Sequence, residues 1–313
     1  MKIRFTLFLL VLLTTFTIHS KDKRQNVEVG VFVEDIYSID YQNSKYQIVF
    51  WLWLNTEDGI FDFEKYLDLS NCADLNISSI DYDSIPEKRK YHSECKITAT
   101  ILNKFNVVNY PFDIQNINLR MEYTKYTDLE DYNLYFDDKS RLSPEFIQDW
   151  TVESSFAKPG IKNYDSNFGY LHSKDPLEFP GIDIQVNLKR DSWNLFFKSF
   201  LTLFVSVILA SISLFYPNNC SEEKMALIVG SLFTTVGNKY VTDGFLPLTN
   251  FNLSDRLHLL TIILITIIAI YAIIEQRFKV RDNVKLDILS FSISFLSFTI
   301  GVAYFTYSAM QSN

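Results

Sequence analysis

The fold of this chain depends on residues 223–241, whose sequence is EKMALIVGSLFTTVGNKYV. The uncharged part, residues 225–238, holds Gly230 and Gly237 together with several hydroxyl side chains, and Lys239 follows it directly. A helix of this composition is unfavourable if lipid surrounds it on all sides. We therefore expect other helices to shield this segment, or water to line one side of it.

The polar groups of this segment are ordered. Ser231, Thr234, Thr235 and Asn238 recur at helical spacing on one face, and Val229, Phe233, Val236 and Tyr240 recur on the opposite face. Several copies of the chain around an axis would shelter such a helix and leave a water-filled path beside it. A tight, dry helix bundle, in which glycines and hydroxyls make close contacts, is the alternative interpretation.

Three other segments, residues 199–216, 257–274 and 288–310, are long and nearly free of charge. Each reaches the roughly 18 residues that mark a bilayer-spanning helix. The connection between the last two, residues 275–287, carries four Lys or Arg residues. An excess of these residues is typical of cytoplasmic loops, so we place this connection in the cytoplasm.

The order of the crossings makes the polar segment a fourth crossing. The N-terminal part of the chain is expected to be exported by the signal peptide described next, so residues 199–216 cross inward. Residues 257–274 also cross inward, because the connection after them is cytoplasmic, so an outward crossing must lie between the two. We therefore predict a four-helix transmembrane bundle within residues 191–313. Its helices are expected near residues 195–216, 223–242, 254–276 and 287–309.

Residues 1–20 have the pattern of a cleavable secretory signal peptide. Lys2 and Arg4 precede a short apolar core, and the segment ends on polar residues. An uncleaved fifth membrane helix is the alternative. A signal peptide would export residues 21–190, so we expect a multi-pass protein of the bacterial inner membrane with an extracytoplasmic N-terminal domain.

Residues 21–190 are predicted to form an antiparallel β-sandwich. Short segments rich in β-branched and aromatic residues alternate with turn signals, which is typical of strands. The predicted strands cover residues 27–33, 46–54, 96–102, 114–122, 150–156 and 182–188. Several short strands without a convincing long helix favour a sandwich.

The exported domain is acidic, with 29 Asp or Glu residues against 19 Lys or Arg residues between positions 21 and 190. This balance argues against nucleic acid as a partner and favours visiting cations, although solubility alone also accounts for it. Cys72 and Cys95 lie in this domain, where an oxidising compartment permits a disulfide. The sequence does not fix the geometry that such a bond requires.

No catalytic constellation is visible in the sequence. His92, His172 and His258 stand without partners at metal-ligand spacing, and neither a Walker-type loop nor a GxSxG elbow is present. The sequence therefore indicates no enzyme, no cofactor and no metal site.

Four short motifs, in order along the chain, carry a family resemblance. YPFDIQ at residues 110–115 looks like an aromatic-Pro-Phe-Asp-x-Gln loop motif, and WTVE at residues 150–153 more weakly resembles a tryptophan-bearing strand of a binding region. EKMAL at residues 223–227 is similar to the Glu-Lys-Met-x-Leu that opens a cation-selective pore helix, and Leu-Pro at residues 246–247 matches the pair that follows it. The chain thus resembles the pentameric ligand-gated ion channels, the Cys-loop receptor superfamily, and especially its bacterial members.

The resemblance implies a homopentamer in lipid, in which the second helix of each subunit lines an ion path. The motifs at both ends of this helix fix an alignment with the family, which we call the family register. In this register five residues would face the lumen, and Phe233 would form a hydrophobic gate: Ala226, Gly230, Phe233, Gly237 and Tyr240. A shift of one residue would instead place Ser231, Thr234 and Asn238 there. Glu222 and Glu223 would form carboxylate rings that attract cations, and an ordinary acidic helix start is the alternative.

The resemblance also implies a gating interface and a ligand site. Asp40, Asp113 and Arg190 match an interfacial cluster in which carboxylates hold the arginine before the first helix. A change in that contact would couple the exported domain to the pore, whereas a static brace is the alternative. The ligand-site candidates are aromatic side chains that would cage a cation or simply pack between strands: Tyr132, Tyr135, Tyr164, Phe168 and Tyr170.

The chain also departs from the family pattern. The loop cysteines are absent, the usual Trp-x-Pro motif is missing before Tyr110, the first membrane helix lacks its proline, and Lys239 is unusual in a cation path. Our leading hypothesis is a subunit of a homopentameric cation channel gated by a small ligand or by protons. A non-conducting, channel-derived membrane receptor or scaffold is the second, and a membrane-bound enzyme is the third.

Overall fold

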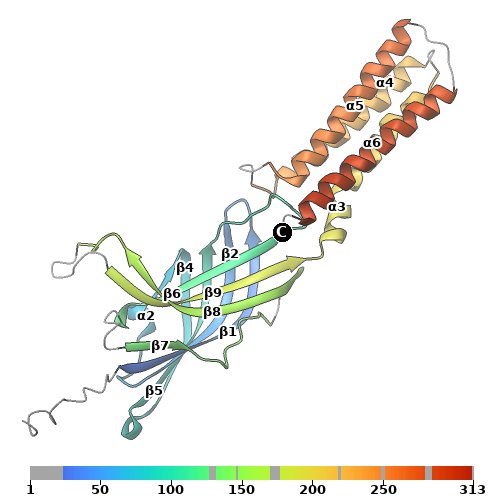
Figure 1. Cartoon of the computed structure of the whole chain (residues 1–313). Coiled ribbons are helices and arrows are strands. Elements are labelled where there is room, and N and C mark those ends of the chain that lie inside the picture. The colour runs from blue at the N-terminus through green and yellow to red at the C-terminus, as the bar shows by residue number, and fades with distance from the viewer. Residues whose placement is uncertain are drawn as a thin grey trace, which may run out of the picture.

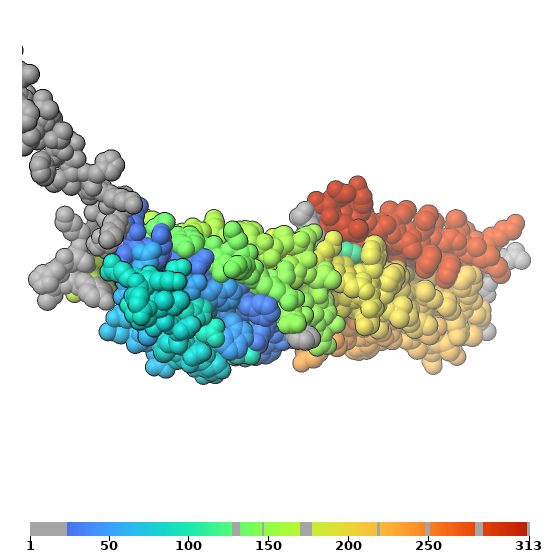
Figure 2. Space-filling view, turned by 90° about the horizontal axis from the view of Figure 1, so that it is seen from below, coloured from blue at the N-terminus to red at the C-terminus, as the bar shows by residue number. Residues whose placement is uncertain are grey.

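A β-sheet domain is followed by a helical domain in an elongated molecule (Figures 1 and 2). This computed structural model describes residues 24–126, 132–145, 147–169, 177–217, 220–247, 251–278 and 284–311. The predicted signal peptide, residues 1–20, lies outside the described residues.

The β-sheet domain contains two sheets packed face to face. The five-stranded sheet has the order β4-β5-β2-β1-β7 and the four-stranded sheet has the order β3-β6-β9-β8. All described strand pairs are antiparallel except β1 with β7, which is parallel. The strands are β1 (Gln25–Asp40), β2 (Lys45–Thr56), β3 (Leu67–Ser70), β4 (Cys72–Ile85), β5 (Lys90–Leu102), β6 (Ile114–Tyr123), β7 (Tyr132–Phe136), β8 (Trp150–Tyr164) and β9 (Leu177–Arg190).

Alternation along the strands builds the core between the sheets. Every second side chain of β2, from Tyr46 to Leu54, is buried, and its neighbours on the strand point outward. These side chains share one core with Leu119 of β6 and Ile184 of β9 in the other sheet. Because side chains of a strand point to alternate faces, a period of two fixes which face is buried.

Each of the six predicted strands lies within an observed strand. The prediction missed β3, β4 and β7. Strand β4 lies at the edge of its sheet and exposes most of its side chains, so its sequence lacks the alternation that marks a half-buried strand.

Strand register keeps Cys72 and Cys95 apart. Cys72 on β4 pairs with Ile101 on β5, whereas Cys95 lies earlier on β5, opposite Leu52 of β2. At ~3.4 Å per residue, Ile101 lies about 20 Å along the strand from Cys95, which is too far for a disulfide to Cys72. Both thiols are free, so Cys72 and Cys95 do not form the disulfide that the sequence left open.

The helical domain contains α3 (Ser192–Ile212), α4 (Ser221–Asp243), α5 (Leu253–Phe278) and α6 (Val284–Gln311). Three stretches in the described residues are long and apolar enough to cross a membrane: α3 with its 3-10 extension (Ser192–Phe215), α5 and α6. These three helices match three of the four predicted crossings. Their length and apolar composition indicate a membrane protein. Helix α4 is not apolar enough to be one of them.

Helix α4 nevertheless lies alongside α3 and α5 (Figure 1). Ile228 of α4 packs in one cluster with Ala210 of α3 and Ile265 of α5. Helix α6 packs on the other side, where Phe298 joins Phe200 of α3. The chain leaves the β-sheet domain in α3, returns in α4, leaves again in α5 and returns in α6 (Figure 1), so the near end of the helices adjoins the sheets and the far end does not.

Candidate functional site

Helix α4 has one face packed against its own chain and one free face. Ala226, Gly230, Phe233, Gly237 and Tyr240 are all exposed on the free face, and the exposed fractions of Phe233 and Tyr240 are 72% and 82%. A methyl group added at Gly230 or Gly237 would meet no neighbouring group within 4 Å. The residues that the family register assigns to a lumen therefore share one accessible face.

The polar face of α4, which carries Ser231, Thr234, Thr235 and Asn238, points mainly toward the rest of the chain. Ser231 and Thr235 are buried, and their hydroxyls donate to the carbonyls of Leu227 at 2.8 Å and Ser231 at 3.0 Å. Thr234 is exposed and donates to Gly230 O at 2.9 Å. The shifted register would turn the buried Ser231 toward a lumen, so only the family register assigns side chains that are all accessible in the single chain.

Asn238 ties the polar side of α4 to two other helices. Its Nδ2 donates to Ser199 O of α3 at 3.0 Å, and its Oδ1 lies 2.9 Å from Nε2 of His258 on α5. The other ring nitrogen of His258 lies 2.7 Å from Ser254 O. His258 is therefore a buried hydrogen-bonded link between helices rather than an isolated histidine.

The far end of α4 separates its charges. Glu222 and Glu223 lie in the first turn and are exposed. Lys224 is buried and forms an ion pair with Glu275 near the end of α5, with side-chain exposures of 4% and 8%. Because this pair is dry, the lysine charge is neutralised inside the helix bundle while the two glutamates face outward.

The near end of α4 holds its second lysine in a similar way. Lys239 forms an ion pair with Asp243 one turn later and, at 2.7 Å, with Asp255 in the first turn of α5. The exposed fractions are 26% for Lys239 and 18% for Asp255, so this network is wetter than the far-end pair. Lys239 therefore does not present an uncompensated charge.

A loop of residues 105–113 docks the β-sheet domain on the helices. The Phe112 ring lies 5.7 Å from the Phe196 ring of α3, and the Tyr110 ring lies 5.6 Å from the Phe245 ring after α4. Phe112 also belongs to the helical core, together with residues of α3, α5 and α6. The loop that carries the YPFDIQ motif therefore contacts α3 and the segment after α4, and it shares a buried cluster with α5 and α6.

Backbone groups add two further links at this junction. Leu253 N, at the start of α5, donates to Val108 O at 2.9 Å. Gln42, in the β1–β2 turn, donates through Nε2 to Asp243 O at the end of α4, at 3.1 Å. Two separate loops of the β-sheet domain thus hold the end of α4 and the start of α5.

Arg190, the last residue of β9, lies in an aromatic box at the junction. Its guanidinium carbon lies 4.0 Å from the ring centroid of Trp150 and 5.2 Å from those of Tyr41 and Tyr110. Cation–π attraction stabilises a charge in such a place. Its ion pair with Asp113 is long, at 3.5 Å between Nη2 and Oδ2, so the three aromatic rings and the carboxylate share the stabilisation of its charge.

Asp113 is held by the motif that contains it. Gln115 Nε2 donates to Asp113 Oδ2 and, at 2.8 Å, to Asn106 O. Within the described part of the chain, Asp113 Oδ1 and Arg190 Nε are buried without a hydrogen-bond partner. Burial raises the pKa of Asp113 to about 6, opposed by the Gln115 hydrogen bond, and burial lowers the pKa of Arg190 to about 9.

Asp40 lies apart from this pair. Its carboxylate accepts from Asn43 N at 3.0 Å and from Asn43 Nδ2 at 2.7 Å, and these bonds lower its pKa. No ion pair between Asp40 and Arg190 occurs in the described residues. The structure thus brings together two members of the predicted cluster, Asp113 and Arg190, and leaves the third in the β1–β2 turn.

A cavity of about 610 Å³ opens beside Arg190. It is lined by Tyr41, Tyr110 and Trp150 from the sheets and by Asn194 and Lys198 from α3. This cavity opens to solvent, so the side chains that line it have more room to move than those of a close-packed core.

The predicted ligand-site aromatics fall in separate places. The hydroxyl of Tyr164 donates to Glu122 at 2.9 Å, and its ring meets the exposed Phe168 ring at 5.2 Å. Tyr132 instead packs against Tyr126, with tilted rings whose centroids lie 4.7 Å apart. Tyr170 lies outside the described residues. Among the described residues, these side chains therefore do not form one aromatic cage within a single chain.

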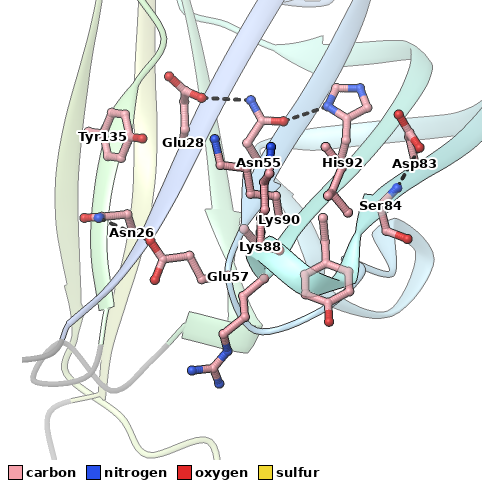
Figure 3. A pocket seen from close by; sticks show the side chains of 14 residues that line it. Asn26, Glu28, Asn55, Glu57, Asp83, Ser84, Lys88, Lys90, His92 and Tyr135 are labelled. Carbon is pink, nitrogen blue, oxygen red and sulfur yellow. Dashed lines mark hydrogen bonds between the residues drawn. The ribbon is translucent and has the colours of Figure 1, made fainter.

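Tyr135 lines a cavity of about 460 Å³ beside the five-stranded sheet (Figure 3). A hydrogen-bonded chain crosses its wall: Asn55 Nδ2 donates to Glu28 at 2.8 Å, and Asn55 Oδ1 lies 2.7 Å from His92 Nδ1. Carboxylates and lysines both line the cavity, among them Glu57 and Lys88. This is a polar site of mixed charge, built by strands whose positions the core fixes.

No family model matches this chain, and no curated protein matches it significantly. The family resemblance therefore rests on the quoted sequence motifs alone. Among the described residues, no group of three or more His, Cys, Asp or Glu side chains is placed to hold a metal ion.

Sequence reasoning missed the two ion-pair sites on α4. The partners Lys224 and Glu275 are 51 residues apart, so no local pattern joins them. The available signal was the position of the charges, because Lys224, Lys239, Asp255 and Glu275 lie close to the ends of segments that are otherwise uncharged. Charged residues within membrane helices are expected to find partners.

Proposed function

We propose that this protein is a subunit of an oligomeric cation channel in which the free face of α4 lines the ion path. The observation that carries the proposal is the division of charge on α4. Its exposed far end carries Glu222 and Glu223, whereas Lys224 and Lys239 are both paired with carboxylates. Carboxylates that face a path attract cations and repel anions.

The packing of α4 supports a fourth crossing. If α3 and α5 span a bilayer, α4 must span it as well, because it lies between them along their length. The free face of α4 would then contact lipid, another protein subunit or water. Gly230 and Gly237 leave gaps between Phe233 and Tyr240 on this face, which suits close approach of a second helix or a water-filled lumen.

The domain junction supports a gating role. Residues 105–113 contact the helices directly, and Arg190 lies in an aromatic box beside a cavity that opens to solvent. A movement of β9 would be passed to α3, because Arg190 ends the strand and α3 begins at Ser192. A small ligand at the polar cavity beside Tyr135, or protonation of buried Asp113, would provide the stimulus.

We propose a homo-oligomer of five copies in the bacterial inner membrane, with the β-sheet domain outside the cytoplasm. The number of copies comes from the family resemblance alone. A second candidate, a non-conducting receptor or scaffold, is favoured by the size of Phe233 and Tyr240, since five copies of either ring would narrow a lumen.

Recording currents from the purified protein in planar bilayers tests the proposal. Wild-type protein should pass K⁺ in preference to Cl⁻ under an asymmetric KCl gradient. The Glu222→Lys/Glu223→Lys variant should lower that preference by about tenfold or more, since about 1.4 kcal/mol in the energy of an ion corresponds to tenfold.

A matched control makes the same charge change elsewhere. Glu64 and Glu87 are exposed in the β-sheet domain, so Glu64→Lys/Glu87→Lys should leave the preference near the wild-type value. Persistent silence of a verified oligomer would favour the non-conducting candidate. Unchanged selectivity in the α4 variant would remove Glu222 and Glu223 from the ion path.

A further inference from the structure

Helix α5 supplies a carboxylate to each lysine of α4. Glu275, near its end, pairs with Lys224, and Asp255, in its first turn, pairs with Lys239. The two helices run in opposite directions, so the beginning of one meets the end of the other. The pairs therefore lie at opposite ends of the α4–α5 contact.

The position of Lys224 on α4 shows what its pairing achieves. Lys224, Ile228, Ser231 and Thr235 form the buried side of the helix, and the free face lies on the other side. The lysine ammonium is thus held away from Glu222 and Glu223, although these are its immediate neighbours in sequence.

A lysine without its carboxylate would not stay there. An unpaired ammonium in a low-dielectric interior is strongly unfavourable, and a long lysine side chain readily turns its charged end toward water. If the free face of α4 lines water, that is the nearest water available within the bilayer. One such ammonium from every subunit would repel cations from the path.

We propose that Glu275 and Asp255 are positioning residues for cation selectivity: by binding Lys224 and Lys239 they keep both ammonium groups off the free face of α4. This inference rests on the proposed channel function. It assigns part of the selectivity to a helix that contributes no residue to the predicted lumen.

Two single variants at the far end separate this role from a structural one. Glu275→Gln and Lys224→Gln both break the same ion pair, so a merely structural role would change both variants alike. On our proposal, Glu275→Gln lowers the K⁺ to Cl⁻ permeability ratio about fivefold by releasing a positive charge, whereas Lys224→Gln does not lower it. The double variant, Lys224→Gln/Glu275→Gln, should return the ratio to the wild-type value.

The reversal potential under a KCl gradient is the readout. An unchanged ratio in a conducting Glu275→Gln variant, or a lowered ratio that the double variant does not restore, overturns the inference while the channel function stands. A silent wild-type oligomer overturns the channel function itself, so the two failures are distinguishable.

The near end provides a variant that should fold if Glu275→Gln does not assemble. Asp255 and Lys239 are partly exposed, and Asp243 stays beside Lys239 when Asp255 is replaced. Asp255→Asn should therefore lower the permeability ratio less than fivefold, about twofold, and Lys239→Gln/Asp255→Asn should restore it. Equal ratios in wild type and Asp255→Asn would then count against the inference.

Discussion

The two ends of the helical domain are held by contacts of opposite character. At the far end, Lys224 and Glu275 form a close and almost fully buried pair. At the near end, Arg190 and Asp113 stand 3.5 Å apart beside a cavity of about 610 Å³. A dry, well-matched pair resists rearrangement, whereas a loose contact with room beside it has alternatives, so movement is expected at the domain junction and not at the far end.

Breaking the far-end pair should have the largest effect on stability. Lys224→Met leaves Glu275 buried without a partner, and removal of one member of a buried pair costs about 3–5 kcal/mol. Thermal denaturation of the detergent-purified protein should show a clear loss of melting temperature.

The matched control replaces both charges at once. Lys224→Met/Glu275→Met fills a similar volume with apolar groups and should be close to wild type in stability, because no charge is left unpaired. If Lys224→Met were as stable as the double variant, the pair would contribute nothing and the contrast between the two ends would fail.

The near-end contact should respond to pH. Burial raises the pKa of Asp113 to about 6, above the ~3.9 of an unfolded aspartate. The folded protein therefore binds the proton more tightly than the unfolded chain, and its stability relative to Asp113→Asn is greatest below about pH 4 and falls as pH rises through about 6. The expected difference is about 2–3 kcal/mol across that window.

Melting temperatures of wild type and Asp113→Asn between acid and neutral pH measure this difference. Asp40→Asn serves as the control, since the hydrogen bonds from Asn43 lower the pKa of Asp40 and its variant should keep the pH dependence of wild type near pH 6. A wild-type profile that runs parallel to Asp113→Asn would show that the pKa of Asp113 is not raised in the folded protein.

Local patterns in the sequence predict the elements of this fold better than its long-range contacts. The alternation of β2 and the uncharged lengths of α3, α5 and α6 are local, and each was predicted. The far-end pair joins residues 51 positions apart, and only packing of α4 against α5 brings them together. Asp40 was placed with Arg190 by a motif, but its carboxylate is satisfied by Asn43 three residues away.

The candidate site on α4 and at the domain junction was likewise predictable only where local sequence patterns determine it. The motif at residues 110–115 identified the docking loop, and its Gln115 explains how Asp113 is held. The orientation of the α4 hydroxyls was not predictable from helical spacing, because spacing groups side chains on a face without saying which face is covered. That depends on α3 and α5, which bury Ser231 and Thr235.

Between the two ends, the free face of α4 is testable through its glycines, where the smallest effect is expected. In a single chain, a methyl group at Gly237 meets nothing within 4 Å, and replacing glycine by alanine in a helix stabilises it by about 0.4–1 kcal/mol. Gly237→Ala should therefore raise the melting temperature of the oligomer slightly if this face borders water.

Gly301→Ala is the matched control, because its methyl would lie 2.6 Å from Leu260 Cδ2 on the neighbouring helix and should destabilise the protein. A loss of stability in Gly237→Ala comparable to that in Gly301→Ala would mean that another subunit packs closely on the free face, which is the dry bundle and not the water-filled path.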